Sequence, residues 1–424
     1  MKKIKIYILL LGLGILIASC VEEIDLVTET DFESALVVEA TITDQVKFQT
    51  VRLTRTYRLE EEGPNIESGA LIKVVSNCGE NYEFTEVSNG VYTSNVEFAA
   101  QSNCDYHLEI ATQDGRHYSS SSEQLTQDTH IDDLYVTRDF NENGDEGVSI
   151  YVDTADPTGN SKFYRYEYVE TYKIIAPQYS PLELVVLNDD FIYPPEFIFM
   201  FDNIEEVIAF FFDIVLREEQ EQVCYNTVAS NTLILASTTD LVEDALDQFR
   251  IRFLGRDNTI ISHRYSILVT QYVQSQEAHT YYTALNELAE NESILSETQP
   301  GFLQGNMVSL SNANEKVVGF FEVSSSDTQR IYFNYADLFP GEIIPPYYLS
   351  CDYIGSPTLL EEDFFHNITN SPVIDALNAG FIFYQFNDNN EGSPFAVTPF
   401  DMVFRECGDC TVYGDNQVPE WWEE

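Results

Sequence analysis

The sequence is poor in basic residues. Its 424 residues contain 21 Lys and Arg against 71 Asp and Glu, a formal net charge of −50 at pH 7. A field of this sign repels nucleic acid and anionic lipid headgroups, which makes both poor partners of the folded chain. The charge suits cation binding, metal-dependent folding or simple solubility, and solubility is the default interpretation. Hydrophobic residues still make up 44% of the chain, enough for sizeable cores, and the length suggests two or three domains.

Signatures of catalysis are also missing from the sequence. There is no H-E-x-x-H, no G-x-S-x-G and no glycine-rich phosphate loop. The 6 histidines are scattered, and none has a metal-ligating neighbour at useful spacing. Carboxylates are so abundant that no pair of them indicates a glycosidase. We therefore predict no catalytic residue and no enzyme, and keep a hydrolase as the less favoured alternative.

The start of the chain has the pattern of an export signal. Three lysines precede the apolar run "IYILLLGLGILI", which is shorter than the roughly 20 residues of a spanning helix, so residues 1–19 are predicted to be a signal peptide. The last residues, Ile17-Ala-Ser19-Cys20, resemble the bacterial lipobox. This resemblance implies cleavage between Ser19 and Cys20 and acylation of Cys20, with palmitate-like chains that anchor the protein stably. The alternative is an ordinary signal peptide with a chance cysteine nearby.

The rest of the chain is predicted to be mainly β. Residues 20–33 are acidic and lack periodicity, as expected of a tether. Alternating segments separated by turn residues then predict a β-sandwich over residues 34–128. A second alternating series predicts a larger β-sandwich-type domain over residues 129–352, with a helical insertion at about 175–248. Residues 353–424 are rich in turns and are expected to pack on this second domain.

Two helices are predicted within the second domain. Asp202 and Glu205 are spaced like a capping box, which predicts a helix from about Asn203 to Glu219. Its wide apolar stripe favours a core helix, and a docking surface for a membrane partner is the alternative. The apolar residues of Gln276–Glu290 also keep helical spacing and predict a second helix.

Six cysteines remain when Cys20 is set aside, an even number in a chain predicted to be exported. Cys78 and Cys104 are the favoured pair because both lie in one short β-rich block. The C-x-x-C motif near the C-terminus has no second pair to complete a zinc site and lies in a Gly- and Asp-rich segment, so it is interpreted as structural. The disulfide candidates are Cys78, Cys104, Cys224, Cys351, Cys407 and Cys410.

The segment "DFNENGDEG" resembles the first half of a calcium-binding loop. Oxygen-bearing side chains alternate before a glycine, as a hard cation requires. The twelfth position is Ile150, so the usual bidentate carboxylate is missing. The alternative interpretation, a solvated hairpin tip, is favoured. The candidate ligands are Asp139, Asn141, Asn143 and Asp145.

The succession of segments along the mature chain resembles one family. The segments "ALVVEATITD", "ESGALIKVVSNCGENYEFTEVSNGVYTS", "HRYSILVTQYVQSQEAHTYYTAL", "GNMVSLSNANEKVVGFFEVS" and "ECGDCTVYGDNQVPEWW" occur in the order found in Bacteroidota outer-membrane lipoproteins with the domain of unknown function 4249. The resemblance implies that the first sandwich is similar to transthyretin-like or carboxypeptidase-regulatory (Ig-like) domains. It assigns no catalytic residue.

The same resemblance carries an expectation about cellular role. Such lipoproteins are often encoded beside a TonB-dependent receptor, and acids after the lipidated cysteine resemble a signal for export to the cell surface. Glu22, Glu23 and Asp25 fit that signal. We therefore expect a lipid-anchored outer-membrane protein that faces the exterior and acts as a non-catalytic binding or accessory module in nutrient uptake. A structural or adhesive surface protein is the alternative, and no cofactor is expected apart from a structural calcium ion.

Overall fold

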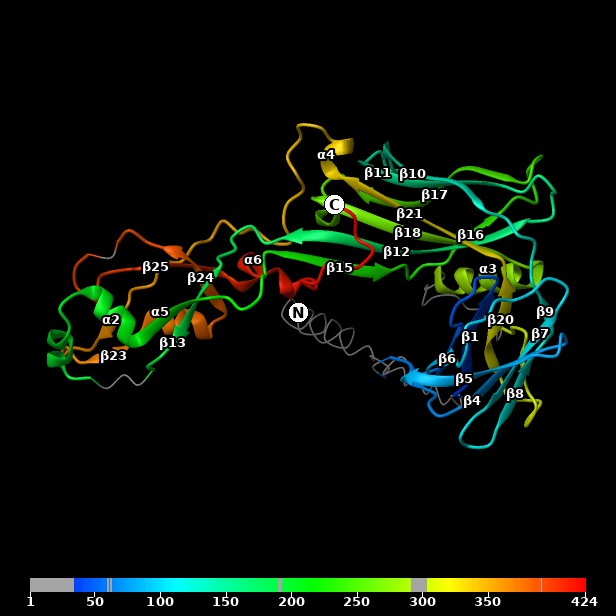
Figure 1. Cartoon of the computed structure of the whole chain (residues 1–424), viewed down its shortest axis with the longest axis horizontal. Helices are drawn as coiled ribbons and strands as arrows, with labels where there is room; N and C mark the ends of the chain where they lie inside the picture. Colours follow the sequence, from blue (N-terminus) through cyan, green and yellow to red (C-terminus); the bar gives the residue numbers. More distant parts are fainter. Residues whose placement is uncertain (1–33, 59–60, 62, 190–192, 291–302, 390) are drawn as a thin grey trace, which may run out of the picture.

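The structure is a computed structural model that describes residues 34–58, 61, 63–189, 193–290, 303–389 and 391–424. It is mainly β, as predicted, and its strands form several sheets. Figure 1 shows an elongated molecule with a first module at one end, a second module in the middle and a lobe that projects from the second module at the other end. We call this projection the distal lobe.

The first module is built from one eleven-stranded sheet around one core. Alternate residues of its first strand are buried, among them Leu36, Val38 and Ile42, because successive side chains of a strand point to opposite faces. The strand order is β19-β8-β7-β4-β5-β6-β2-β1-β20, with β3 beside β2 and β9 beside β7. The strands are β1 (Leu36–Thr43), β2 (Thr50–Arg55), β3 (Asn65–Ile66), β4 (Leu71–Ser76), β5 (Asn81–Ser88), β6 (Val91–Ser94), β7 (Asp105–Ala111), β8 (His117–Ser120), β9 (Glu123–Gln124), β19 (Met307–Ser309) and β20 (Val317–Ser324).

Two strands of this sheet come from far along the chain, beyond the predicted boundary at residue 128. Strand β20 pairs in parallel with β1, so that Val38 faces Gly319. A Cβ atom at Gly319 would lie 2.0 Å from the carbonyl oxygen of Val38, so only glycine permits this close approach. The first module is therefore completed by a segment that follows most of the second module.

The second module is a pair of sheets that share one core. Ile150 and Leu254 of the smaller sheet and Tyr166 and Ile267 of the larger one all belong to this core. The smaller sheet has the order β10-β11-β17 and the larger one β15-β12-β18-β21, with β16 also beside β12. The strands are β10 (Ile131–Phe140), β11 (Glu146–Ala155), β12 (Phe163–Ile175), β15 (Val223–Ala229), β16 (Ile234–Ser237), β17 (Ala245–Gly255), β18 (Arg264–Val273) and β21 (Ser326–Asn334), and the short helices are η2 (Thr259–Ile261), α4 (Tyr335–Leu338), α6 (Arg405–Gly408) and η3 (Cys410–Val412).

The predicted helix at Gln276–Glu290 is confirmed as α3 (Gln276–Glu290). It begins directly after Ser275, whose hydroxyl oxygen accepts a hydrogen bond from the amide of Ala278 at 3.1 Å. Helix α3 follows β18 and lies between the two modules, where Tyr281 packs against Phe320 of β20 with ring centroids 5.7 Å apart. Its position brings the side chains of Tyr281 and Tyr282 to the joint between the modules.

The distal lobe combines residues 181–216 of the predicted insertion with residues 353–404. Phe211 and Phe212 from the first segment and Phe383, Phe400 and Met402 from the second form one core. Residues 353–404 thus pack on the insertion, whereas β15 and β16 from the same insertion return to the larger sheet. The elements are β13 (Leu182–Val186), η1 (Pro195–Met200), α2 (Ile204–Phe211), β14 (Phe212–Leu216), β22 (Glu361–Glu362), β23 (Ile368–Asn370), α5 (Pro372–Asn378), β24 (Phe381–Phe386) and β25 (Phe400–Phe404).

The predicted helix from Asn203 to Glu219 is wrong beyond Phe211. Helix α2 ends there, and β14 continues as a strand that pairs antiparallel with β13. Pairing with β13 and burial of Phe212 against the lobe core outweigh the helical spacing of the apolar residues, because tertiary contacts override local propensity. The cap is also one residue later than predicted, since the side chain of Asn203, not Asp202, accepts the hydrogen bond from the Glu206 amide.

Candidate binding pocket

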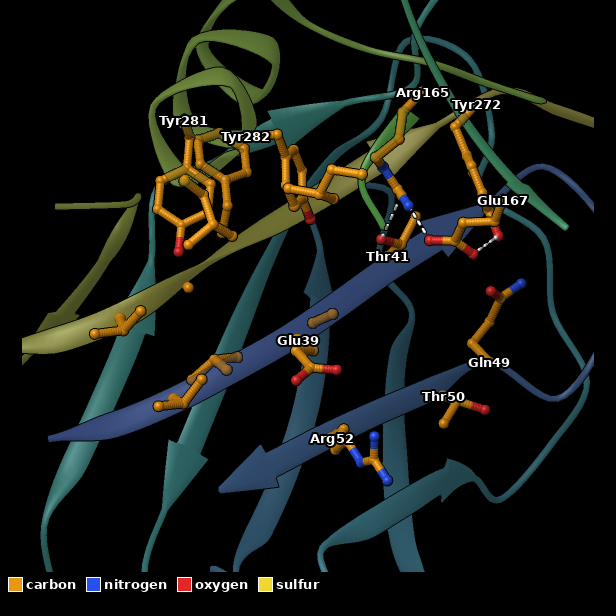
Figure 2. A pocket seen from close by; sticks show the side chains of 18 of the residues that line it. Glu39, Thr41, Gln49, Thr50, Arg52, Arg165, Glu167, Tyr272, Tyr281 and Tyr282 are labelled. Atoms are coloured by element: carbon orange, nitrogen blue, oxygen red, sulfur yellow. Dashed lines mark hydrogen bonds and ion pairs between the residues drawn. The ribbon is translucent and has the colours of Figure 1, made fainter. Parts of the chain in front are cut away.

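A pocket of about 710 Å³ opens where the first module, the larger sheet and α3 meet. Figure 2 shows that β1 and β2 form one wall, and that the side chains of Tyr281, Tyr282, Tyr272 and Arg165 approach from the opposite side. Pockets of this size accommodate small-molecule ligands and commonly occur where domains meet. The joint between the modules is therefore the candidate functional site.

Strand periodicity explains how the first module supplies its wall. Val38 and Ala40 of β1 point into the core of the first module, so Glu39 and Thr41 point the other way, into the pocket. Arg52 of β2 is exposed beside them. Residues that look like the solvent face of an ordinary strand thus line the pocket because the second module lies opposite them.

Arg165 is the central charged group of the pocket. It is only 3% exposed, although it sits on β12 among aromatic residues. Its Nη2 donates to Glu322 Oε2 at 3.0 Å and to Thr41 Oγ1 at 3.3 Å, and its Nη1 forms a short ion pair with Glu167. Burial alone would lower the pKa of Arg165, but Glu322 and the other neighbouring groups raise it above the ordinary range, so the side chain stays charged.

The pair formed by Arg165 and Glu322 fastens the two modules together. Glu322 belongs to β20 of the first module and is 2% exposed, and its second carboxylate oxygen accepts from Gln274 Nε2 at 3.2 Å. Gln274 in turn contacts His279 Nδ1 of α3 at 3.1 Å. Burial lowers the pKa of His279, which keeps the ring neutral at neutral pH. Buried charges of this kind are held when hydrogen bonds satisfy them, and both carboxylate oxygens of Glu322 are bonded here, whereas the Nε of Arg165 has no hydrogen-bond partner among the described residues.

Tyrosines supply the aromatic part of the pocket. The guanidinium carbon of Arg165 lies 4.2 Å from the ring centroid of Tyr272 and 5.0 Å from that of Tyr282, which are cation–π distances. Burial raises the pKa of Tyr281 to about 12 and the pKa values of Tyr272 and Tyr282 still further. All three hydroxyls are therefore protonated at neutral pH and can donate hydrogen bonds, but they cannot act as bases.

The charges around the pocket nearly cancel, in contrast to the strongly acidic chain. Lys47, Arg52 and Arg165 line it together with Glu39 and Glu167, and Glu322 pairs with Arg165 beneath the surface. Burial lowers the pKa of Lys47, opposed by its acidic neighbours. Among the described residues, no histidine, cysteine or serine lines the pocket. The arrangement can bind a polar molecule through stacking and hydrogen bonds.

The residues predicted for lipidation and surface export lie outside the part of the chain that the structure describes. These residues are Ser19, Cys20, Glu22, Glu23 and Asp25.

The other six cysteines form three disulfides, and Cys78 pairs with Cys104 as the sequence favoured. The two cysteines of the C-x-x-C motif bind different partners, because Cys407 pairs with Cys351 and Cys410 with Cys224. These two bonds join the C-terminal segment to Cys351, which directly precedes the second segment of the distal lobe, and to β15, so the motif has a structural role.

Three of the candidate calcium ligands, Asn141, Asn143 and Asp145, lie in the turn between β10 and β11, and the fourth, Asp139, lies in β10. Asn141 Oδ1 accepts hydrogen bonds from the amides of Asn143 and Asp145 at 2.9 and 2.8 Å, and so closes the turn. Asp139 points to Tyr151 of the neighbouring strand through a short hydrogen bond. The structure thus brings Asn141, Asn143 and Asp145 together in one turn, but the side-chain oxygen of Asn141 already accepts hydrogen bonds from the backbone of that turn.

Within residues 34–424, leaving aside the gaps given above, no three His, Cys, Asp or Glu side chains are grouped so that they could hold a metal ion. In the same part of the chain, every helix is too short or too polar to span a bilayer.

The pocket residues were not predicted from the sequence, apart from the helix that carries Tyr281 and Tyr282. One signal was present in "YRYEYVETY", where Arg165 lies between Tyr164 and Tyr166 in a strand rich in tyrosine. A buried arginine in such a strand requires a carboxylate partner. One carboxylate partner, Glu167, is two residues away in the same strand, but the buried partner, Glu322, lies 157 residues away along the chain, so nothing local identifies it.

The fold and the pocket define a mainly β protein of several modules with a ligand-sized pocket at a joint between them. The chain belongs to the family described as "Domain of unknown function (DUF4249)", which matches residues 21–330. The matched segment includes both walls of the pocket and confirms the domain of unknown function predicted from the sequence.

Other comparisons add little to this assignment. No curated protein matches the chain. Two structures of a cycloalternan-degrading enzyme from Trueperella pyogenes, one of them with isomaltose, share 11% and 9% identity with 68% of this chain. The match spans only 31% of the enzyme chain, and its TM-score of 0.14 is too low to support any inference.

Proposed function

We propose that this protein is a non-catalytic binding module whose pocket takes a small ligand that is neutral or zwitterionic, such as a short oligosaccharide or peptide. The observation that carries the proposal is the pocket of about 710 Å³ between the modules, with near-balanced charge and a tyrosine wall. A ligand of strong negative charge would meet the field of the whole chain, whereas a neutral or zwitterionic one does not.

The pocket residues have distinct roles in this proposal. The rings of Tyr281 and Tyr282, with Leu285 beside them on α3, offer apolar contact area. Glu39 and Arg52 on the opposite wall offer an acceptor and donors that fix the orientation of a polar ligand. Arg165 is a positioning residue, because its charge is already satisfied by carboxylates and it holds the two walls together.

The cellular setting is the second part of the proposal. We infer an outer-membrane lipoprotein, anchored through Cys20, that faces the cell exterior and assists a TonB-dependent transporter in nutrient capture. The lipobox and the acids that follow it support this location, and the family resemblance supports the partner. Tagged protein purified from native outer membranes should carry a barrel transporter with it. Recovery without any barrel protein contradicts this part, and a deletion that weakens attachment but not uptake favours the adhesive alternative.

Binding measurements test the pocket itself. Soluble protein is titrated with panels of neutral oligosaccharides and of tripeptides by calorimetry, and at least one compound is expected to bind. Leu285→Trp should fill the pocket and weaken the binding of that compound by about tenfold or more. Val242→Trp is the matched control, because Val242 is fully exposed on a loop and does not line the pocket. Unchanged affinity in Leu285→Trp rules out this pocket as the binding site.

A further inference from the structure

The far end of the distal lobe exposes large apolar side chains. Phe199 and Met200 of η1 are 86% and 76% exposed, and Phe364 and Phe365 in the turn between β22 and β23 are 91% and 73% exposed. A hydrogen bond from the amide of Ile368 to the carbonyl oxygen of Tyr193, 3.1 Å long, joins the segments that carry these pairs. We call these four side chains the apex. Figure 1 shows α2 and β23, which follow these two pairs in the chain, at the end of the lobe that points away from both modules.

The apex is presented on an ordered turn. Asp363 Oδ1 accepts hydrogen bonds from the amides of Phe365 and Asn367 at 2.8 and 2.9 Å. His366 adopts a positive φ of 62°, and its Nδ1 lies 2.9 Å from Glu362 Oε2. Local hydrogen bonds of this kind hold the two phenylalanines outward, where they lose contact with the lobe core. Exposed apolar side chains held in this way are typical of interaction sites.

The lobe that carries the apex has an extreme charge composition. Its two segments, residues 181–216 and 353–404, contain 15 Asp and Glu and not a single Lys or Arg. Exposed acids flank both pairs in the sequence, with Glu196 and Asp202 on either side of Phe199 and Met200, and Glu361 and Glu362 before Phe364 and Phe365. The apolar side chains are thus flanked by acidic residues, and the two segments contain no Lys or Arg to offset them.

The negative charge of the lobe favours some binding partners of this apolar surface and disfavours others. A second copy of this chain carries a net charge of −50 and is repelled. Anionic lipid is repelled for the same reason. A protein surface with an apolar hollow surrounded by Lys and Arg is complementary in both respects, because opposite potentials accelerate encounter and the buried phenylalanines slow dissociation.

We propose that the apex of the distal lobe docks a partner protein whose contact surface is an apolar hollow rimmed by lysine and arginine. Phe364 and Phe365 enter the hollow, with Phe199 and Met200 beside them, and the surrounding carboxylates pair with the basic rim. The inference is independent of what the pocket binds.

Site-specific cross-linking in native envelopes tests the proposal. A photoreactive phenylalanine analogue replaces Phe365 in the full-length chain, and the same analogue replaces Val242 as the control. The protein linked at position 365 but not at 242 is identified, purified and titrated with the full chain. Its affinity should fall at least tenfold when salt rises from about 0.15 M to about 1 M, because screening removes the charge pairing.

Two paired variants then separate the apolar contribution from folding. Phe364→Ser with Phe365→Ser should weaken binding at least tenfold without changing the melting temperature, whereas Leu241→Ser with Val242→Ser, an exposed pair on the second module, should leave binding unchanged. Leu285→Trp, the pocket variant, should also bind the partner normally. Binding of the partner at the apex is therefore tested separately from ligand binding in the pocket. No specific cross-link at Phe365, or affinity that is insensitive to the Phe364 and Phe365 substitutions, overturns the proposal. If the chain binds phosphatidylcholine vesicles and the same substitutions abolish that binding, the proposal of a protein partner is overturned in favour of a lipid surface.

Discussion

Replacement of Arg165 by methionine tests whether the buried ion pair holds the two modules together. Arg165→Met keeps a long apolar side chain between Tyr272 and Tyr282 but removes the guanidinium. Glu322, which is 2% exposed, then keeps only Gln274 and Thr41 as hydrogen-bond partners. Removal of one partner of a buried pair leaves an uncompensated charge and costs about 3–5 kcal/mol. We expect a loss of stability of that size.

Calorimetry of the soluble chain measures this loss. A domain of 150–250 residues loses about 2–4 °C of melting temperature per kcal/mol, so the transition should move down by about 10 °C. Arg138→Met is the matched control, since Arg138 also pairs with two carboxylates, Glu146 and Glu342, but its side chain is 40% exposed. Exposed pairs of this kind contribute little, so the control should melt close to the wild type.

A double substitution separates two causes of lost stability, the unpaired carboxylate of Glu322 and the lost packing of the Arg165 side chain. Arg165→Met combined with Glu322→Gln removes both charges, and most of the lost stability should return because no unpaired carboxylate remains. If Arg165→Met lowers the melting temperature no more than Arg138→Met does, the ion pair between Arg165 and Glu322 does not hold the two modules together. Failure of Glu322→Gln to restore stability would instead assign the loss to packing against the two tyrosines.

Three further predictions concern other parts of the molecule. Loss of the disulfide in Cys78→Ala with Cys104→Ala, whose cysteines are 26 residues apart, should cost about 3.5 kcal/mol in urea denaturation, and an unchanged midpoint would show that it does not constrain the unfolded chain. Burial alone would raise the pKa of Asp156, but hydrogen bonds from Thr158, Ser161 and Asn160 outweigh burial and lower the pKa below its ordinary value. The ionised Asp156 therefore stabilises the fold above about pH 4, and this stabilisation is lost as the pH falls below that. Asp156→Asn should lose less stability than the wild type between about pH 5 and pH 2. The calcium hypothesis requires a rise in melting temperature with calcium that Asp139→Ala abolishes, and no rise at millimolar calcium rejects it.

Local patterns in the sequence were sufficient for several features. Period-two alternation identified most strands of both modules, since each strand buries one face, as β1 does with Leu36, Val38 and Ile42. Helical spacing identified α3 with its observed ends. The same signal failed in α2, where Phe212 and the residues after it pair with β13. Apolar spacing cannot decide between helix and strand when the partner strand is supplied by another part of the chain.

The sequence by itself determined the β class, the family, the pairing of Cys78 with Cys104 and the acidic charge, because each rests on residues that are close together or on composition. Only the tertiary structure decided that β20 completes the first module, that residues 353–404 join the insertion in a distal lobe, and that Arg165 meets Glu322 beside a pocket. These contacts join residues far apart in the chain, and the outward face of a strand such as β1 looks the same in sequence whether it meets solvent or a second module. The pocket exists because the second module covers that face.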